Sequence, residues 1–288
     1  MPCEFLQTMI MSENHEIVKL AAAEELDIRK TFECGQCFRW NETEDLVYHG
    51  VAFGYPAKVW QEADEVFISS DAPEELWHGY FDLDRDYEAA SASFRGGEYL
   101  DEAKRFGRGI RILRQEPWEA LCSFIISQCN NIPRIKGIIE RLCACFGDAV
   151  SFEGREYHTF PAAERIARLS LEDLQPLRSG YRAEYILNAA KDICSGSIDL
   201  DSLACTDWVS AEKALLSMKG IGKKVADCVL LFGLHHMEAF PVDVWIRRAL
   251  KEHFPPDFDP SALGENAGLA QQYIFYYARS GQPGQNMT

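Results

Sequence analysis

The sequence predicts an α+β protein with an N-terminal antiparallel β-sheet domain and an all-helical body after it. Short β-type runs alternate with turn residues as far as residue 69. From about residue 87 the apolar residues recur at the spacing of helices. No internal repeat or long linker interrupts the chain, so we expect the two parts, residues 1–100 and 101–288, to pack on each other.

Four runs of the N-terminal part are expected to be strands, because β-branched and aromatic residues fill them and turn residues bound them. These runs are residues 37–40, 46–53, 57–60 and 66–69. The first dozen residues carry no such pattern, and we give them no role.

The helical part opens with two segments that differ in their apolar pattern. Residues 117–128 are apolar nearly all round, which predicts a central buried helix. Residues 133–147 carry one apolar stripe between an initial proline and a final glycine. Further helices are predicted at residues 161–169, 171–178, 182–195, 210–218, 224–235, 244–254 and 265–279.

The composition is that of a folded intracellular protein. Apolar residues make up 47% of the 288 residues, which excludes a disordered chain. No apolar run approaches the roughly 20 residues that span a bilayer. The first residues lack a basic segment followed by an apolar core. We therefore expect no membrane role and an intracellular location, cytoplasmic or nucleoid-associated if the source is bacterial.

The net charge of −16 is unusual for a protein that binds nucleic acid, because basic side chains normally neutralise phosphates. The distribution of this charge along the chain makes nucleic-acid binding easier to reconcile with the net value. Residues 1–103 hold 23 acidic and 7 basic side chains, whereas residues 104–288 hold 22 of each. A nucleic-acid contact is therefore expected on the C-terminal part. The alternative is that both parts only have solvated acidic faces.

Ten cysteines are scattered through the chain, several at core spacing in predicted helices, which favours reduced thiols over disulfides. Cys34 and Cys37 form a CxxC pair, but no second pair or histidine pair accompanies them. We therefore predict no metal site.

The segment from residue 218 to 228 is the most informative part of the chain. Gly220 and Gly222 allow a tight turn with exposed backbone N–H groups, which suits a phosphate, and a helix follows at once. Lys224 lies at the start of that helix, and Cys228 shares its face one turn later. A lysine attacks as a nucleophile in its neutral form, which burial, a proton acceptor or nearby positive charge favours.

Asp243 lies nineteen residues after Lys224, directly before a predicted helix. An aspartate at this position is expected to be the N-cap, held by backbone N–H groups and kept ionised. A fixed carboxylate of this kind suits a cationic transition state. As an alternative, Lys224 is a solvated charge, Cys228 is a core residue and Asp243 is only a cap.

Gly-Ile-Gly-Lys-Lys-Val-Ala-Asp-Cys at residues 220–228, with Pro-Val-Asp-Val at 241–244, resembles the helix-hairpin-helix (HhH-GPD) DNA glycosylase superfamily and, within it, the 8-oxoguanine DNA glycosylase/lyase branch. The resemblance extends from roughly residue 30 to 280. It implies a TBP-like sheet domain packed on a helix-hairpin-helix body. Other branches carry a four-cysteine iron–sulfur loop after this region. No cysteine follows residue 228, so no iron–sulfur cluster is expected.

The resemblance also implies a pocket for the damaged base. Residues 34–40 are similar to the family's Gly-Gln-x-Phe-Arg-Trp motif, in which the glycine carbonyl accepts the N7–H that 8-oxoguanine has and guanine lacks. Gly35 is the matching residue. Phe275 and Cys228 would cover the two faces of the flipped base, and Gln271 would bond its Watson–Crick edge. Alternatively, Gly35 is a plain turn and residues 268–279 are an aromatic core stripe.

A second set of residues would hold the opened duplex. Cys129, Asn130 and Asn131 match the loop that fills the gap left by the flipped nucleotide, and Arg134 would bond the orphaned cytosine. Cys129 departs from the asparagine typical of this branch and loses the amide's paired donor and acceptor, which leaves the opposite-base preference open. The alternative for Asn130 and Asn131 is ordinary helix capping.

Gly-Tyr-Arg-Ala-Glu-Tyr at residues 180–185 matches a further motif of the family. Tyr181 would wedge between base pairs and Arg182 would bond the cytosine edge. Gly220 and Gly222 would bind the lesion-strand phosphates, with a monovalent cation possible at the hairpin carbonyls and no other cofactor. Trp245 occupies a position where some relatives have a phosphate-binding histidine.

The activity implied is base-excision repair. A monomer would flip 8-oxoguanine out of duplex DNA opposite cytosine and release it through a Schiff base on Lys224, with Asp243 stabilising the cationic sugar. β-Elimination would then act as an abasic-site lyase. Two alternatives stay open: a monofunctional glycosylase for alkylated bases, which usually lacks the lysine, and a non-catalytic hairpin protein that only binds DNA.

Overall fold

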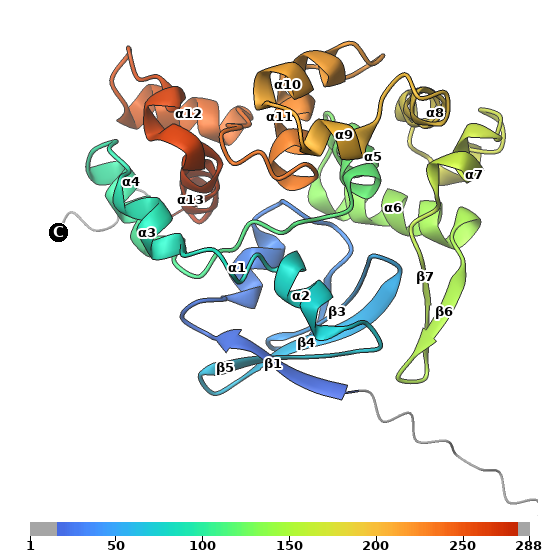
Figure 1. Ribbon diagram of the computed structural model, residues 1–288, viewed down its shortest axis with the longest axis horizontal. Coiled ribbons are helices and arrows are strands. Elements are labelled where there is room, and N and C mark those ends of the chain that lie inside the picture. Colours follow the sequence, from blue (N-terminus) through green and yellow to red (C-terminus); the bar gives the residue numbers. More distant parts are fainter. Residues whose placement is uncertain (1–15, 282–288) are drawn as a thin grey trace, which may run out of the picture.

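A five-stranded antiparallel sheet forms the N-terminal part of the computed structural model, which describes residues 16–281 (Figure 1). The sheet order is β1-β5-β4-β3-β2. Helices α1 (Ile28–Glu33) and α2 (Glu74–Tyr80) lie between the sheet and the remaining helices. The strands are β1 (Glu16–Ala22), β2 (Asn41–Glu44), β3 (Val47–Ala52), β4 (Tyr55–Glu62) and β5 (Glu65–Ser70).

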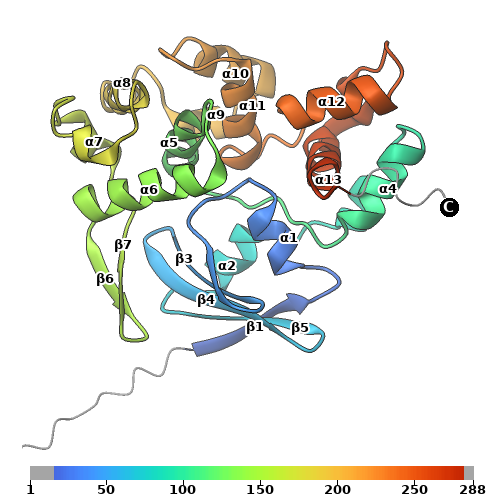
Figure 2. The same cartoon turned by 180° about the vertical axis from the view of Figure 1, so that it is seen from behind.

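The helical body covers one side of the sheet, and its first helices pack against its last, α4 against α13 (Figures 1 and 2). The central helix α5 is buried nearly all round, as its sequence predicted. The α-helices are α3 (Tyr87–Ala92), α4 (Glu98–Phe106), α5 (Pro117–Ser127), α6 (Ile132–Phe146), α7 (Ala163–Ala167), α8 (Arg182–Cys194), α9 (Leu200–Ala204), α10 (Trp208–Leu216), α11 (Lys223–Phe232), α12 (Val244–His253) and α13 (Ala267–Arg279).

The sheet and the body interlock through the segment that follows α1. The Gln36 side chain is fully buried, donates to the Arg111 carbonyl at 2.7 Å and accepts from the Leu113 N–H at 2.9 Å. Phe38, in the sheet part of the chain, is buried in the core of the body, whereas Leu113 is buried in the core of the sheet part. The predicted packing of the two parts is therefore confirmed; the boundary at residue 100 stays a prediction.

Asp82, which follows α2, makes a second link between the parts. Its carboxylate accepts from Arg85 Nε at 3.0 Å, Arg114 Nε at 2.8 Å and the Tyr87 hydroxyl at 2.9 Å. The ring of His235, just after the helix that carries Lys224, lies 3.4 Å from it. Burial opposes ionisation of Asp82, but His235 and Arg114 outweigh burial and hold the pKa of that carboxyl well below its usual range.

The fold class is confirmed, with local differences. Residues 37–40 do not form the predicted strand, because the Gln36 bonds hold this segment in a turn and bury Trp40, and β2 begins one residue later. Only the short 3₁₀-helix Gln175–Leu177 forms in the predicted helix 171–178. A second 3₁₀-helix, Pro260–Asn266, precedes α13.

Sequence reasoning missed the strand β1, the helices α1, α2 and α9, and the hairpin of β6 (Ala149–Phe152) and β7 (Arg155–His158), and it gave no bounds for α3 and α4. The hairpin extends from the body alongside the sheet (Figure 1), and its Tyr157 hydroxyl lies 3.0 Å from His49 Nδ1 of β3. The first dozen residues lie outside the described part of the chain. No helix among residues 16–281 is long and apolar enough to cross a membrane.

Candidate active site and DNA interface

The turn between α10 and α11 has the geometry that its glycines predicted. Gly220 has φ +84°, and an added Cβ would lie 2.4 Å from the ring of Tyr185, so both the backbone conformation and the space require glycine. Gly222 is the N-cap of α11. The first N–H groups of α11 therefore face the turn without helical partners, an arrangement that binds anions.

Lys224, in the first turn of α11, is partly buried and held from several sides. Its Nζ donates to Ser127 Oγ at 3.3 Å and lies 5.5 Å from the ring centre of Phe124. Cys228, one turn later, lines the same pocket as Lys224, so α11 brings the amine and the thiol to one place, as predicted. Burial raises the pKa of Cys228 to about 11, so this thiol is neutral at physiological pH.

Lys223 does not lend its charge to the site. Its Nζ pairs with Asp227 at 2.8 Å and also with Glu212. Burial lowers the pKa of Lys223, but the two carboxylates outweigh burial and raise it. Lys223 therefore adds no net positive charge beside Lys224, because its own two carboxylate partners offset its charge.

Asp243 is the N-cap of α12, as predicted. Its Oδ1 accepts from the backbone N–H groups of Trp245 and Ile246, both at 2.9 Å. The second carboxylate oxygen has no such bond and is free to face the pocket that Asp243 lines with Lys224. One oxygen of Asp243 can therefore cap the helix while the other serves the proposed chemistry.

Six of the predicted residues meet at one narrow cavity of about 50 Å³. They come from four separate segments of the chain: Gly35, Lys224, Cys228, Asp243, Gln271 and Phe275. The rest of the lining is Cys34, Phe124, Phe232, Pro241 and Gln272. The alternative in which these are unconnected cap, turn and core residues does not account for this convergence.

Both residues that the motifs predict for base recognition, Gly35 and Gln271, line the pocket. Gly35 has φ +79°, and an added Cβ would lie 3.2 Å from the Phe275 ring, so backbone and ring are in close contact. The Gln271 Nε2 donates to the Pro241 carbonyl at 3.0 Å. Its Oε1 is buried with no hydrogen-bond partner among the described residues. A buried acceptor without a donor is costly unless a ligand supplies the donor.

The loop between α5 and α6 is held in part by its own amides. Asn131 is the N-cap of α6 and accepts from the Arg134 N–H at 3.0 Å, so the capping alternative holds for it. Asn130 Nδ2 donates to the Ile126 carbonyl at 3.0 Å. Cys129 is exposed, with φ +47°, and the Arg134 side chain is also exposed. DNA contacts of these four residues stay predictions.

Tyr181 and Arg182 lie side by side at the start of α8 but differ in exposure. Tyr181 is 49% exposed, as a wedge residue requires. Arg182 is buried, and its guanidinium donates to the backbone carbonyls of Gln128, Cys129 and Ser179. In this structure Arg182 therefore holds the loop between α5 and α6, and its contact with cytosine stays a prediction. Sequence could not reveal the loop contacts, because they join residues about fifty positions apart.

Trp245 lies 39% exposed beside the more exposed Val244 at the start of α12. The N-terminal end of α12 therefore presents an exposed indole, and the N-terminal end of α11 presents backbone N–H donors. A phosphate contact of Trp245 stays a prediction, as does a monovalent cation at the hairpin.

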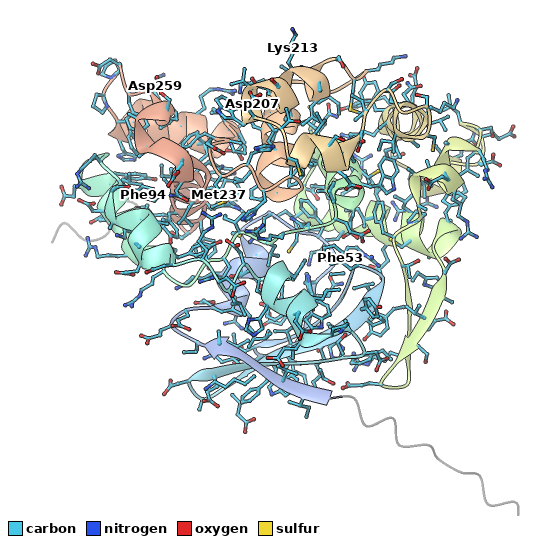
Figure 3. The ribbon with its side chains drawn as sticks, in the orientation of Figure 1. Phe53, Phe94, Asp207, Lys213, Met237 and Asp259 are labelled. Atoms are coloured by element: carbon cyan, nitrogen blue, oxygen red, sulfur yellow. The ribbon has the colours of Figure 1, made fainter. Side chains whose placement is uncertain are left out.

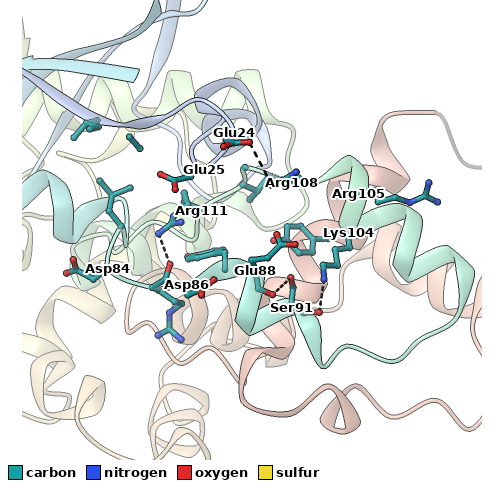
Figure 4. A pocket seen from close by; sticks show the side chains of 18 of the residues that line it. Glu24, Glu25, Asp84, Asp86, Glu88, Ser91, Lys104, Arg105, Arg108 and Arg111 are labelled. Atoms are coloured by element: carbon teal, nitrogen blue, oxygen red, sulfur yellow. Dashed lines mark hydrogen bonds and ion pairs between the residues drawn. The ribbon is translucent and has the colours of Figure 1, made fainter. Parts of the chain in front are cut away.

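Larger cavities lie away from Lys224. One of about 950 Å³ is lined by β1, α3 and α4 (Figure 4). Its charged side chains are largely engaged locally: Lys104 donates to the Ser91 carbonyl at 3.1 Å, and Arg108 lies 4.0 Å from Glu24. Acidic and basic groups alternate there without converging on one point, so the smaller pocket with Lys224 is the better candidate. Among residues 16–281 no cluster of three or more metal-binding side chains forms.

Comparison with known proteins agrees with this site. Residues 19–121 match the family described as 8-oxoguanine DNA glycosylase, N-terminal domain, and residues 122–266 match the HhH-GPD superfamily base excision DNA repair proteins. The chain is 33% identical to the probable N-glycosylase/DNA lyase of Methanothermobacter thermautotrophicus, over 88% of this chain and 94% of that protein. It is 31% identical to the N-glycosylase/DNA lyase of Saccharomyces cerevisiae, over 84% and 72%.

Among solved structures, the 8-oxoguanine glycosylase/lyase of Clostridium acetobutylicum, in complex with double-stranded DNA containing cytosine opposite 8-oxoguanine, is similar. It superposes with a TM-score of 0.84 at 33% identity, covering 92% of this chain and 98% of that one. The resemblance predicted from the motifs is confirmed: the chain belongs to the HhH-GPD superfamily of base excision DNA repair proteins, in its 8-oxoguanine DNA glycosylase branch.

Proposed function

We propose that this protein excises 8-oxoguanine from double-stranded DNA, opposite cytosine, and then nicks the strand as an abasic-site lyase. The convergence of Lys224, Asp243 and the Gly35–Phe275 base pocket around one cavity carries this proposal. These groups supply three different functions, which are nucleophilic attack, charge stabilisation and base recognition. A protein that only binds DNA has no need for all three together.

The N–H groups at the start of α11 bind the lesion-strand phosphates and bring the damaged nucleotide to the pocket. Neutral Lys224 attacks C1′ through Nζ. The bond from C1′ to the base breaks, and Asp243 stabilises the positive charge on the sugar. The proton lost from Nζ goes to the departing base, and opening of the sugar ring, with a proton taken up by O4′ from solvent, gives the Schiff base. Removal of a C2′ proton then expels the 3′-phosphate.

The two bases are distinguished at N7, which is a hydrogen-bond donor in 8-oxoguanine and an acceptor in guanine. The Gly35 carbonyl accepts from the N7–H of 8-oxoguanine and repels the N7 lone pair of guanine. The unpaired Gln271 Oε1 accepts from an N–H on the Watson–Crick edge. Because the cavity is only about 50 Å³, Phe275 must move away from Gly35 to admit a purine.

Duplexes with one 8-oxoguanine, one 3-methyladenine or only normal bases test the proposal. Excision of 8-oxoguanine with strand cleavage before alkali treatment is expected, as is the highest rate opposite cytosine. Release of 3-methyladenine with cleavage only after alkali would instead indicate a monofunctional enzyme for alkylated bases. Binding without excision would indicate a non-catalytic protein. Sedimentation of the complex is expected to show one protein per duplex.

A further inference from the structure

Ser127, the last residue of α5, contacts the nucleophile from a different helix. Its Oγ lies 3.3 Å from Lys224 Nζ and 2.8 Å from the carbonyl of Phe124, one turn earlier in α5. Lys224 and Ser127 are 97 residues apart in sequence. Only the packing of α11 on α5 brings them together.

The chemistry of a hydroxyl fixes the direction of this bond. Ser127 has one hydroxyl proton, and it is donated to the Phe124 carbonyl. Toward Lys224 the oxygen can therefore only accept. It holds one N–H of Lys224 and does not compete for the lone pair with which the amine attacks.

The walls of the pocket limit the orientation of the amine further. Cys228 lines the same cavity as Lys224, and the ring centre of Phe124 lies 5.5 Å from Nζ. A neutral amine has two N–H bonds and one lone pair. With one N–H bond directed at Ser127, the lone pair is left free to face the cavity that Phe124, Lys224 and Cys228 line.

We propose that Ser127 is a positioning residue for Lys224: by accepting a hydrogen bond from Nζ it aims the lone pair at C1′ of the flipped nucleotide. The proposal rests on the proposed function of Lys224. The opposing interpretation is that Ser127 only satisfies a carbonyl at the end of α5.

Single-turnover excision from an 8-oxoguanine:cytosine duplex at saturating protein distinguishes the two. Ser127→Ala is expected to slow excision and borohydride-trapped adduct formation about 10-fold, the usual effect of one hydrogen bond. Binding to a duplex with an uncleavable abasic analogue is expected to stay within about 2-fold of the parent. Ser127→Thr keeps the oxygen and is expected to retain most of the rate. Ser127→Val, of the same shape without the oxygen, is expected to behave like Ser127→Ala.

Ser195→Ala is the matched control. Ser195 also ends a helix and donates to the carbonyl three residues earlier, at 3.0 Å, but it lies outside the pocket. It is expected to excise at the parent rate. Equal rates for Ser127→Thr and Ser127→Val, or a parent rate for Ser127→Ala, would overturn the positioning role. Absence of excision and adduct in the parent protein would refute the proposed function instead, so the two failures are distinguishable.

Discussion

Gly35 illustrates how one residue meets two demands. Its φ of +79° is a conformation that other residues rarely adopt, and its missing Cβ leaves room for the Phe275 ring. Gly35 also lines the base pocket, where its carbonyl is proposed to distinguish 8-oxoguanine from guanine. The effects of backbone strain and of lost recognition can be measured separately, because Gly54 has the same φ as Gly35 but does not line the pocket.

We predict that Gly35→Ala and Gly54→Ala destabilise the protein by similar amounts, about 1 kcal/mol or somewhat more, because both glycines have φ +79°. Only Gly35→Ala is expected to lower kcat/KM for 8-oxoguanine, by at least about 10-fold. An added Cβ lies 3.2 Å from Phe275 at residue 35 but no closer than 3.8 Å to any atom at residue 54. Thermal unfolding and excision assays check this. Equal losses of activity would show that Gly35 acts only through stability.

The sequence identified those residues whose roles depend on neighbours that lie close to them along the chain. Gly220, Lys224 and Asp243 are recognisable because turn, helix start and cap lie within a short segment. Ser127 and Arg182 lie within recognisable motifs, but their contacts with Lys224 and the Gln128 carbonyl depend on packing between distant helices. Spacing along the chain carries no information about such contacts.

At the scale of elements, the N-terminal ends of α11 and α12 form the proposed reactive centre. α11 presents Lys224 in its first turn, and α12 presents Asp243 as its N-cap. In the proposed function, the positive ends of both helices face the anionic DNA. The capping role of Asp243 and its proposed catalytic role use the same carboxylate. Capping depends on an oxygen that accepts hydrogen bonds, whereas stabilisation of a cationic sugar depends on the negative charge.

We predict that Asp243→Asn lowers single-turnover excision about 100-fold or more and leaves the melting temperature nearly unchanged. Asparagine caps helices as well as aspartate but has no charge to stabilise a cationic sugar. Asp243→Ala is expected to lose the cap as well, at a cost of about 1 kcal/mol in unfolding free energy.

The matched control is Asp207→Asn, at the N-cap of α10 outside the pocket (Figure 3). It is expected to change neither the rate nor the stability. If Asp243→Asn excised at the parent rate, Asp243 would be a structural cap alone.

The elements that sequence missed lack a strong pattern. The strand predicted at residues 37–40 does not form, because the buried Gln36 side chain donates to the carbonyls of nearby Thr31 and distant Arg111 and holds the chain in a turn. The alternation of apolar residues carries no information about these bonds. The hairpin β6–β7 consists of two four-residue strands, too short for a clear alternation.

On the scale of the whole molecule, the sheet part and the catalytic body are joined by buried polar links. Asp82 is 3% exposed and connects the end of α2 to His235, beyond the C-terminal end of the helix that carries Lys224. Gln36 makes the other link. We therefore expect the two parts to unfold in one transition rather than separately.

We predict that Asp82→Asn lowers the unfolding free energy by about 3 kcal/mol at pH 7, because it leaves Arg114 and Arg85 without their carboxylate. The folded pKa of Asp82 is depressed, so its contribution is full above the unfolded pKa of about 3.9 and is lost as the pH falls toward the folded pKa. The difference between parent and variant should be constant from pH 5 to 7 and shrink below about pH 4.

Urea unfolding across that pH range measures the difference. Asp84→Asn, two residues away and exposed, is the control and should change the unfolding free energy by less than about 0.5 kcal/mol. A difference for Asp82→Asn that grew as the pH fell would contradict the ionised link.

The central claim is that Lys224 attacks the sugar of the damaged nucleotide. Borohydride trapping on an 8-oxoguanine:cytosine duplex, followed by mass spectrometry of the cross-linked peptide, tests it most directly. The predicted result is one adduct, located on Lys224 and absent from Lys224→Gln, a variant that still binds the duplex. An adduct on another residue, or base release by Lys224→Gln at the parent rate, would contradict the assignment.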